Sequence, residues 1–541
     1  MVGHKKIAKA AGVVSLATLI SRILGFIRDM IIAKMFGAGM MADAFFVAFR
    51  IPNMLRALLG EGALSASFIP VFTEYLTRRS REESWRVAGA SLTTLSLVLI
   101  LVSFFGVLLS PILVRLIAPG FIGVPEKLRI TILLTRIMFP YIFFVGLSAL
   151  IMAILNSLGH FASPAFSPVM FNLSLIWAAL FLAPRFQEPV LALAVGVLIG
   201  GLGQVLIQVP AAMRRGISFY PHFDLANPAI RRVGHLMAPG TAGLAITQVN
   251  VFISTLLASF LAEGSVSYIY YSFRLVHLPL GAFGVAIATV ALPSMSSAVA
   301  ERSIEKLKET FSFALRLALF ITIPAMVGLI VFRVPIIHLL FERGRFTRDM
   351  TLGTSDVLFF FSLGLCFYVV TRILVPVFYS FQDTRTPVKV GAVAVVSDIL
   401  FSLMLMPTMK VNGLALATAL SSIINVALLV TILRRRIGPL GGRSIMRSLF
   451  QVLMASIAMG LMVWMSLKIY NPLTISSLSG KVLVLGVQIL LGIFVFLGVA
   501  FVLRIEELVF VGKIIGEKVK ISQTRGQGLN RSEEHKKDLT A

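Results

Sequence analysis

The chain has 541 residues, of which 57% are hydrophobic and only 13% are charged. Ordinary soluble domains carry about 25% charged residues, so this composition excludes a soluble globular protein. The apolar runs are continuous over about 20 residues or more, which also excludes an outer-membrane β-barrel, whose strands alternate apolar and polar residues. The composition predicts an all-α, polytopic membrane protein.

Apolar runs bounded by charge, proline and glycine predict about 14 transmembrane helices. In chain order they lie near residues 10–36, 41–70, 87–117, 130–155, 164–183, 189–213, 233–261, 266–295, 310–341, 352–380, 387–407, 412–433, 445–469 and 481–504. The loops on one side of this arrangement, together with both termini, hold 29 lysines and arginines, and the opposite loops hold 12. The positive-inside rule therefore predicts that both termini are cytoplasmic, and the net charge of +25 indicates topology rather than nucleic-acid binding.

The sequence repeats itself at an offset of about 223 residues. Phe49-Arg50 matches Phe273-Arg274, Pro70 matches Pro293, Pro111 matches Pro335, Gly120 matches Gly344, and Pro164 matches Pro387. Each copy spans an even number of helices, so both enter the membrane from the same side, which predicts two parallel six-helix repeats forming two lobes around a central cavity. The predicted parts are an N-terminal lobe at 1–215 with helices 1–6, a C-terminal lobe at 216–437 with helices 7–12, helices 13–14 at 438–505, and a polar cytoplasmic tail at 506–541.

Eight arginines fall inside the predicted helices, where each costs roughly 2.5–3.5 kcal/mol at the bilayer centre. They are Arg22, Arg28, Arg50, Arg56, Arg136, Arg274, Arg316 and Arg372. Such residues usually face a water-filled cavity and mark the path of a charged ligand. Asp43 and Arg50 stand seven residues apart, as do Ser267 and Arg274, so each pair lies on one helix face.

The repeat places Arg50 and Arg274 at matching positions in the two lobes, which favours a cationic cavity between them. Arginine donates two parallel hydrogen bonds to phosphate oxygens, so the predicted ligand is a phosphate or a pyrophosphate. The alternative is that the arginines pair with Asp29, Asp43 and Glu61 and serve packing or topology.

Six short segments stand out as motifs: 21–29 (SRILGFIRD), 36–39 (FGAG), 42–53 (ADAFFVAFRIPN), 61–63 (EGA), 164–168 (PAFSP) and 383–387 (DTRTP). They resemble the MurJ/MviN family of lipid II flippases, in the multidrug/oligosaccharidyl-lipid/polysaccharide exporter superfamily. The resemblance runs in register to residue 436 and more loosely to residue 505. It implies two six-helix lobes and two additional C-terminal helices that form a groove for a lipid tail.

The resemblance implies that the protein moves lipid II, an undecaprenyl-pyrophosphate disaccharide-pentapeptide, from the cytoplasmic to the outer leaflet of the bacterial inner membrane by alternating access, for cell-wall synthesis. Matching motif positions make Arg22, Arg28, Asp43, Arg56 and Arg274 substrate-binding residues, with Arg50 and Asn53 beside them, and the helical spacing adds Ser267. The family often has an acidic residue where this chain has Phe273, so Arg274 is expected to lack a local counter-ion. The alternative is a related flippase or exporter for another polyprenyl-pyrophosphate-linked glycan or a drug-like substrate.

We expect no enzymatic activity and no cofactor, because the seven histidines are scattered and no HExxH motif, paired metal spacing or Asp-rich loop occurs. Transport would be coupled to the membrane potential, to sodium or to protons. Asp398 and Asn250 are the candidate metal-binding residues for a coupling ion, with structural hydrogen bonds as the alternative. The expected partners are lipid II, membrane lipid and proteins of cell-wall synthesis, and not nucleic acid.

Overall fold

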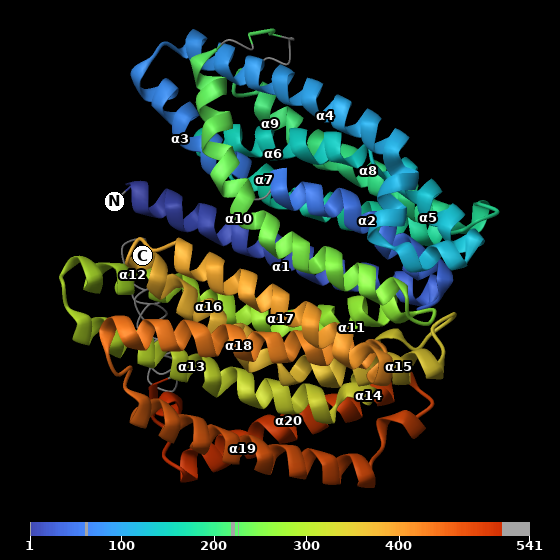
Figure 1. Cartoon of the computed structure of the whole chain (residues 1–541), viewed down its shortest axis with the longest axis vertical. Helices are drawn as coiled ribbons and strands as arrows, with labels where there is room; N and C mark the ends of the chain where they lie inside the picture. Colours follow the sequence, from blue (N-terminus) through green and yellow to red (C-terminus); the bar gives the residue numbers. More distant parts are fainter. Residues whose placement is uncertain (1, 60–62, 218–221, 225–226, 511–541) are drawn as a thin grey trace, which may run out of the picture. The chain divides into compact units, whose positions relative to one another are not determined.

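The computed structural model describes residues 2–59, 63–217, 222–224 and 227–510, with the side chains of 2–11, 58–59, 63 and 238–247 outside the description. Every regular element in this part of the chain is a helix (Figure 1), as predicted. The helices form two compact units. The first unit comprises the residues up to Phe273 together with Leu340–Val357 and Gly391–Thr418; the second comprises Arg274–Leu339, Leu358–Val390 and the residues from Ala419 onward.

The first unit contains the helices of the N-terminal half of the chain. They are α1 (Val2–Phe36), α2 (Met40–Leu59), α3 (Ala63–Arg78), α4 (Arg81–Ile117), η1 (Pro119–Gly123), α5 (Pro125–Met138), α6 (Tyr141–Ser157), α7 (Ala162–Trp177), η2 (Ala178–Leu182), η3 (Ala183–Arg185), α8 (Leu191–Leu206), α9 (Val209–Met213) and α10 (Pro228–Ser259). Some later helices have residues in both units: α11 (Ser265–Pro279), α14 (Arg333–Phe341), α15 (Arg348–Leu363), α17 (Arg385–Met409) and α18 (Val411–Ile437). The second unit also contains η4 (Leu280–Gly284), α12 (Val285–Ala300), α13 (Ile304–Val331), α16 (Leu365–Ser380), α19 (Gly442–Ile469), η5 (Pro472–Thr474) and α20 (Leu478–Val502).

One apolar core cluster of the first unit lies between α3, α4, α6 and α10. Phe68 and Phe72 stand four residues apart on one face of α3, so both reach this core, where their rings stack at 5.2 Å between centroids. The other side of α4 leaves large apolar side chains such as Phe104 and Leu108 exposed. A surface of this kind is stable only against lipid or another apolar partner, which agrees with a membrane-spanning helix.

In the second unit, α13 packs against α19, and α19 packs against α20. Arg316 of α13 forms ion pairs with Glu506 at 2.7 Å and with the buried Glu507 at 3.3 Å. Ser448 of α19 donates a hydrogen bond of 3.2 Å to Glu507. These contacts tie the residues that follow α20 to α13 and α19. The remainder of the predicted polar tail, 511–541, lies outside the described residues.

Ten of the predicted segments are long, apolar helices able to cross a membrane in the part of the chain that the structure describes. Another, near 352–380, is the pair α15 and α16, which meet at a bend of 41°. Three predicted segments remain. The segments 10–36 and 41–70 carry most of the charged residues predicted to bind substrate, namely Arg22, Arg28, Asp43, Arg50 and Arg56. The segment 233–261 includes side chains outside the description. The count of fourteen spans therefore stays a prediction.

The prediction of a single helix over 41–70 depends on residues 60–62, which lie outside the described residues; α2 ends at Leu59 before them and α3 begins at Ala63 after them. The predicted helix at 130–155 is divided, with α5 ending at Met138 and α6 beginning at Tyr141, on either side of Pro140.

The helix starts follow the offset found in the sequence. Adding 223 to the first residue numbers of α4, α5 and α7, which are 81, 125 and 162, gives 304, 348 and 385, where α13, α15 and α17 begin. The compact units divide at other positions, since the first part of α11 belongs to the first unit. The predicted lobe boundaries at 215 and 437 therefore stay predictions.

Candidate substrate-binding site

Asp43, near the start of α2, is buried, and both of its carboxylate oxygens accept hydrogen bonds. Its Oδ2 accepts hydrogen bonds from Lys127 Nζ at 2.8 Å and from the backbone N–H of Gly264 at 2.8 Å. Its Oδ1 accepts from the backbone N–H of Ser267 at 2.9 Å and from Ser267 Oγ at 2.7 Å. Gly264 and Ser267 open α11, whose first N–H groups have no partner within the helix. Asp43 therefore acts as a cap supplied by another helix, and Lys127 of α5 neutralises its charge.

Arg28 of α1 lies at the centre of a second buried cluster. Its Nε and Nη2 donate to Oδ1 of Asp29 at 3.0 and 2.7 Å, and its Nη1 donates to Oδ1 of Asn172 on α7 at 3.1 Å. The hydroxyl of Tyr270 on α11 lies 3.3 Å from Arg28 Nη2 and donates to Asp29 Oδ1 at 3.3 Å. The alternative interpretation of the sequence, in which arginines pair with carboxylates, is therefore realised at Arg28, whose charge Asp29 compensates.

Arg50, on α2, differs from Arg28 because no described residue forms an ion pair or hydrogen bond with its side chain. The side chain is half-buried and lies close enough to Tyr270 to interact with it electrostatically. Aromatic rings surround this part of α2: Phe46 stacks on Tyr270 at 3.9 Å between centroids, and Phe49 stacks on Phe171 at 5.9 Å. Arg50 is thus a partly exposed guanidinium, with no carboxylate partner among the described residues, beside a compensated cluster.

The remaining predicted residues lie in different environments. Arg22 is exposed on α1, so its charge is accessible, as a substrate-binding residue requires. Arg56 donates a hydrogen bond of 3.0 Å to Asn53 Oδ1, one turn earlier on α2. Arg274 belongs to the second unit and, like Arg372, lies near enough to His277 to act on it electrostatically.

The two candidate residues for a coupling ion lie on separate helices. Asp398 is buried on α17, and Asn250 lies on α10 with a buried Oδ1 that accepts no hydrogen bond from a described residue. No group of three or more His, Cys, Asp or Glu side chains that could hold a metal ion occurs among the described residues.

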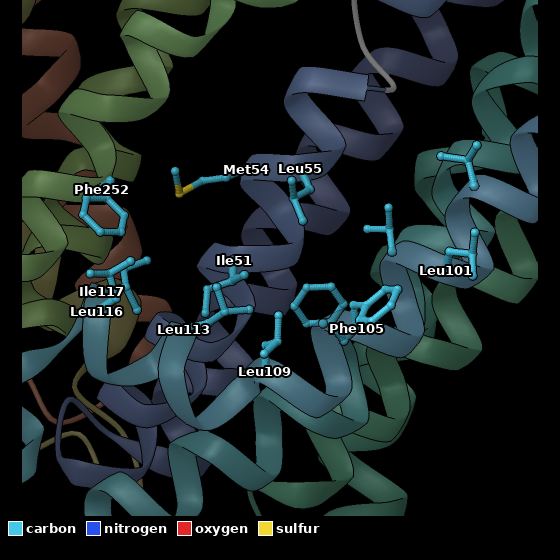
Figure 2. Close-up of a pocket in the computed structure, with 14 residues that line it drawn as sticks. Ile51, Met54, Leu55, Leu101, Phe105, Leu109, Leu113, Leu116, Ile117 and Phe252 are labelled. Carbon is cyan, nitrogen blue, oxygen red and sulfur yellow. The ribbon is translucent and has the colours of Figure 1, made fainter.

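The face of α2 next to Arg50 is apolar and lines a cavity of about 520 Å³ within the first unit. Figure 2 shows Ile51, Met54 and Leu55 of α2 turned toward side chains of α4, with Phe252 of α10 across the space. All fourteen lining residues are apolar or glycine: Ile51, Met54, Leu55, Val98, Leu101, Val102, Phe105, Gly106, Leu109, Leu113, Leu116, Ile117, Phe139 and Phe252. The residue spacing explains the arrangement: Ile51, Met54 and Leu55 share one helix face, Arg50 lies at the edge of that face, and Asn53 lies on the opposite side.

Three residues of these clusters were not predicted: Lys127, Asn172 and Tyr270. Lys127 was counted as a loop charge, although it is 6% exposed and forms the ion pair with Asp43. Asn172 is a polar residue inside an apolar helix, a signal that could have marked it. Tyr270 follows Ser267 by three residues and so shares its helix face, a spacing that could have marked it.

Known proteins resemble this chain over most of its length. A family model described as lipid II flippase MurJ matches residues 32–483. The probable lipid II flippase MurJ of Vibrio cholerae is 39% identical over 432 residues, which cover 79% of this chain and 82% of that protein. The lipid II flippase MurJ of Burkholderia cenocepacia is 34% identical over 423 residues, covering 77% and 82%.

Solved structures agree with these sequence matches. A lipid II flippase MurJ in an inward closed conformation superposes with a TM-score of 0.76 and 27% identity, covering 91% of this chain and 98% of that one. An inward-facing multidrug transporter of the MATE family superposes with a TM-score of 0.65 at 14% identity, covering 78% and 96%, which shows a shared fold alone. The length of the family match and the identities of the relatives establish that this chain belongs to the MurJ family of lipid II flippases.

Proposed function

We propose that this protein flips lipid II from the cytoplasmic to the outer leaflet of the bacterial inner membrane, for peptidoglycan synthesis, with both termini cytoplasmic. Membership of the MurJ family supports the substrate, and the many apolar helices long enough to span a membrane support the location. In this proposal the protein transports lipid II without cleaving it, and proteins of cell-wall synthesis supply and consume the substrate.

The observation that carries the proposed binding mode is the side chain of Arg50, which has no carboxylate partner in the described part of the chain. A guanidinium held beside aromatic rings and away from a counter-ion has two parallel N–H groups available for a diphosphate. Arg28 takes a different role, because Asp29 and Asn172 hold it and it positions Tyr270 next to the diphosphate. Arg22, Asn53, Arg56 and Arg274 complete the substrate-binding set.

The proposed transport cycle is alternating access, in which the lobes move about the bound headgroup. Asp43 supports such a cycle because it joins α2 and α5 to the first turn of α11 through hydrogen bonds that can break and re-form. An inside-negative potential would favour outward movement of the anion by about 2.3 kcal/mol per net charge per 100 mV. Sodium or proton coupling through Asp398 or Asn250 is the further possibility within this proposal.

Helices α19 and α20 are proposed to hold the lipid tail. Large apolar side chains are exposed on both, including Phe450, Leu461 and Met465 on α19 and Phe494 and Phe501 on α20. A polyprenyl chain lying along this surface would keep its hydrocarbon out of water while the headgroup crosses the membrane.

The test is complementation of a bacterium depleted of its own lipid II flippase, with outer-leaflet lipid II measured by its accessibility to an externally added lipid II-binding reagent. The unsubstituted chain should restore accessibility with the pyrophosphate intact. Arg50→Ala should reduce transport by about 10- to 100-fold, the loss expected when charge-assisted hydrogen bonds of about 1.5–3 kcal/mol are removed, and Arg50→Lys should retain part of it.

The matched control is Arg136→Ala, because Arg136 is also an arginine within a membrane helix but is exposed and bonded to Ser110. Membrane levels of both variants are measured. Failure of the unsubstituted chain to restore accessibility would refute the function, and equal transport by the Arg50 and Arg136 variants would refute the binding mode alone.

A further inference from the structure

A second pocket in the first unit, of about 450 Å³, is lined by basic residues. Its lining residues, here called the arginine pocket, are Leu76, Arg81, Trp85, Leu158, Arg214 and Arg215. They come from the end of α3, the first turns of α4, the residue after α6 and the residues after α9. Nothing in the proposed transport cycle uses this pocket.

The three guanidinium groups of the arginine pocket have no acidic partner among the described residues. Two acidic residues on α3 and α4 pair with other arginines: Glu83 lies 4.0 Å from Arg79, and Glu74 accepts from Arg232 at 2.9 Å. Glu82, which follows Arg81, forms no ion pair with a lining residue in the described part of the chain. An excess of positive charge in one small concave site raises the local concentration of anions.

The pocket's donors are held in place by backbone and side-chain contacts. Arg215 Nη2 donates to Nδ1 of His160 at 3.0 Å, Arg215 Nη1 donates to the Ala211 carbonyl at 3.3 Å, and Arg81 Nη2 donates to the Arg215 carbonyl at 3.4 Å. The acceptor at His160 Nδ1 must be unprotonated, because arginine can only donate. These contacts reduce the ordering that ligand binding would otherwise require.

Gly216 brings two of the donors together. A Cβ atom built on this residue would lie 3.6 Å from Arg81 Nη2 and 3.7 Å from Trp85 Nε1, so both nitrogens converge on the same stretch of backbone. Gly216 has φ of +87°, a conformation that other residues rarely adopt, which keeps a side chain from covering these donors. No described residue accepts a hydrogen bond from Trp85 Nε1.

The arginine pocket lies at the ends of two candidate membrane spans, where lipid headgroups are expected. Arg81 is the first residue of the span Arg81–Leu108, and Arg214 directly follows Met213, which ends the span Leu191–Met213. Arginine and tryptophan both favour this interface, and basic clusters there attract anionic lipids. The positive-inside count predicts that this is the cytoplasmic surface.

We propose that the arginine pocket binds the phosphate of an anionic phospholipid headgroup. The guanidinium groups and Trp85 Nε1–H donate to the phosphate oxygens, while Leu76 and Leu158 contact the glycerol and the first acyl carbons. The ligand is a resident lipid and not the transported substrate, so the proposal is independent of the proposed function.

The experiment uses fluorescence of Trp85 in the full chain. Phenylalanine replaces the other two tryptophans of the sequence, Trp177 and Trp464, so that Trp85 reports alone. The protein is reconstituted in phosphatidylcholine vesicles that contain increasing fractions of phosphatidylglycerol brominated near the top of the acyl chains. Half-maximal quenching should occur at a lower fraction of brominated phosphatidylglycerol than of brominated phosphatidylcholine. Arg81→Gln and Arg215→Gln should each reduce this preference about fivefold, and Arg215→Lys should reduce it less.

The matched control is Arg86→Gln, which removes the same charge from the same exposed end of α4 without altering a lining residue. It should leave the preference unchanged. Identical quenching curves for the two lipids in the unsubstituted background would overturn the proposal, and this outcome does not depend on whether any variant folds. An equal loss in Arg86→Gln would also overturn it, as would removal of the quenching by sub-millimolar inorganic phosphate, which would assign the pocket to a soluble anion.

Discussion

The buried charges around α2 and the charges of the arginine pocket differ in what compensates them. Asp43 and Lys127 neutralise each other at 2.8 Å, and Arg28 is held by Asp29. The arginine pocket, at the ends of membrane spans, has basic groups without a described acidic partner. Burial explains the difference, because an ion costs several kcal/mol in a low-dielectric interior and much less beside water and headgroups.

Arg50 combines features of the two groups of charges. Arg50 lies on α2 beside the buried, paired charges, yet no described carboxylate pairs with it. In lacking an acidic partner it resembles the arginines of the arginine pocket. A charge left in this state is expected to serve a ligand. Neutralising the paired charges should therefore reduce stability, whereas neutralising the unpaired ones should reduce binding.

The largest expected effect is on the Asp43 cluster. Asp43→Ala should lower the free energy of unfolding by about 3–5 kcal/mol, because Lys127 is left as an uncompensated buried charge and α11 loses its cap. Thermal unfolding of the purified protein in detergent measures this loss. Adding Lys127→Met should restore much of the stability.

The control for this comparison is the ion pair of Arg129 with Glu188, in which the arginine is more than half exposed. Arg129→Gln should cost at most about 1 kcal/mol, because exposed pairs contribute little. If Arg129→Gln and Asp43→Ala lowered the unfolding temperature equally, burial would not be the reason for the pairing.

An intermediate effect is expected for Arg28 and Asp29. A double-mutant cycle with Arg28→Gln and Asp29→Asn should give a coupling energy of about 1.5–3 kcal/mol, the range for hydrogen bonds to charged groups. Thermal unfolding of the four proteins supplies the values. A coupling energy near zero would mean that water screens the pair and that Arg28 is as available to substrate as Arg50.

The smallest effect is expected at His160, beside the arginine pocket and between two membrane spans. Partial burial, followed by the charge of Arg215, lowers the pKa of His160 below its ordinary value. The unfolded chain then binds a proton first as the pH falls, so stability is complete above about pH 6.5 and declines below it. Thermal unfolding between neutral and mildly acidic pH should show this decline.

His160→Gln should remove that part of the pH dependence while keeping an oxygen acceptor for Arg215. If the variant and the unsubstituted protein lost the same stability at acidic pH, titratable groups other than His160 would be responsible for the loss. That result would mean that the charge of Arg215 in the arginine pocket does not affect the protonation of His160.

Helices were predictable because their signals are local. Residue spacing correctly placed Asp43 and Arg50 on one helix, and the 223-residue offset anticipated where α13, α15 and α17 begin. The division between α5 and α6 was missed because the apolar run continues across Pro140. The alternative in which the arginines pair with Asp29, Asp43 and Glu61 named Asp29, and Arg28 is the arginine that bonds to it.

The sequence by itself determined that this protein is a helical membrane protein with ionised side chains in its predicted spans, because hydropathy and helical periodicity act over a few residues. Its short motifs, such as residues 21–29, supplied the resemblance to the MurJ family. Only the tertiary structure decided which charges remain available. Lys127 reaches Asp43 across 84 positions, and Asn172 reaches Arg28 across 144. A partner so distant along the chain is set by how helices pack, and the cost of an unpaired buried ion is the physical reason that packing brings such partners together.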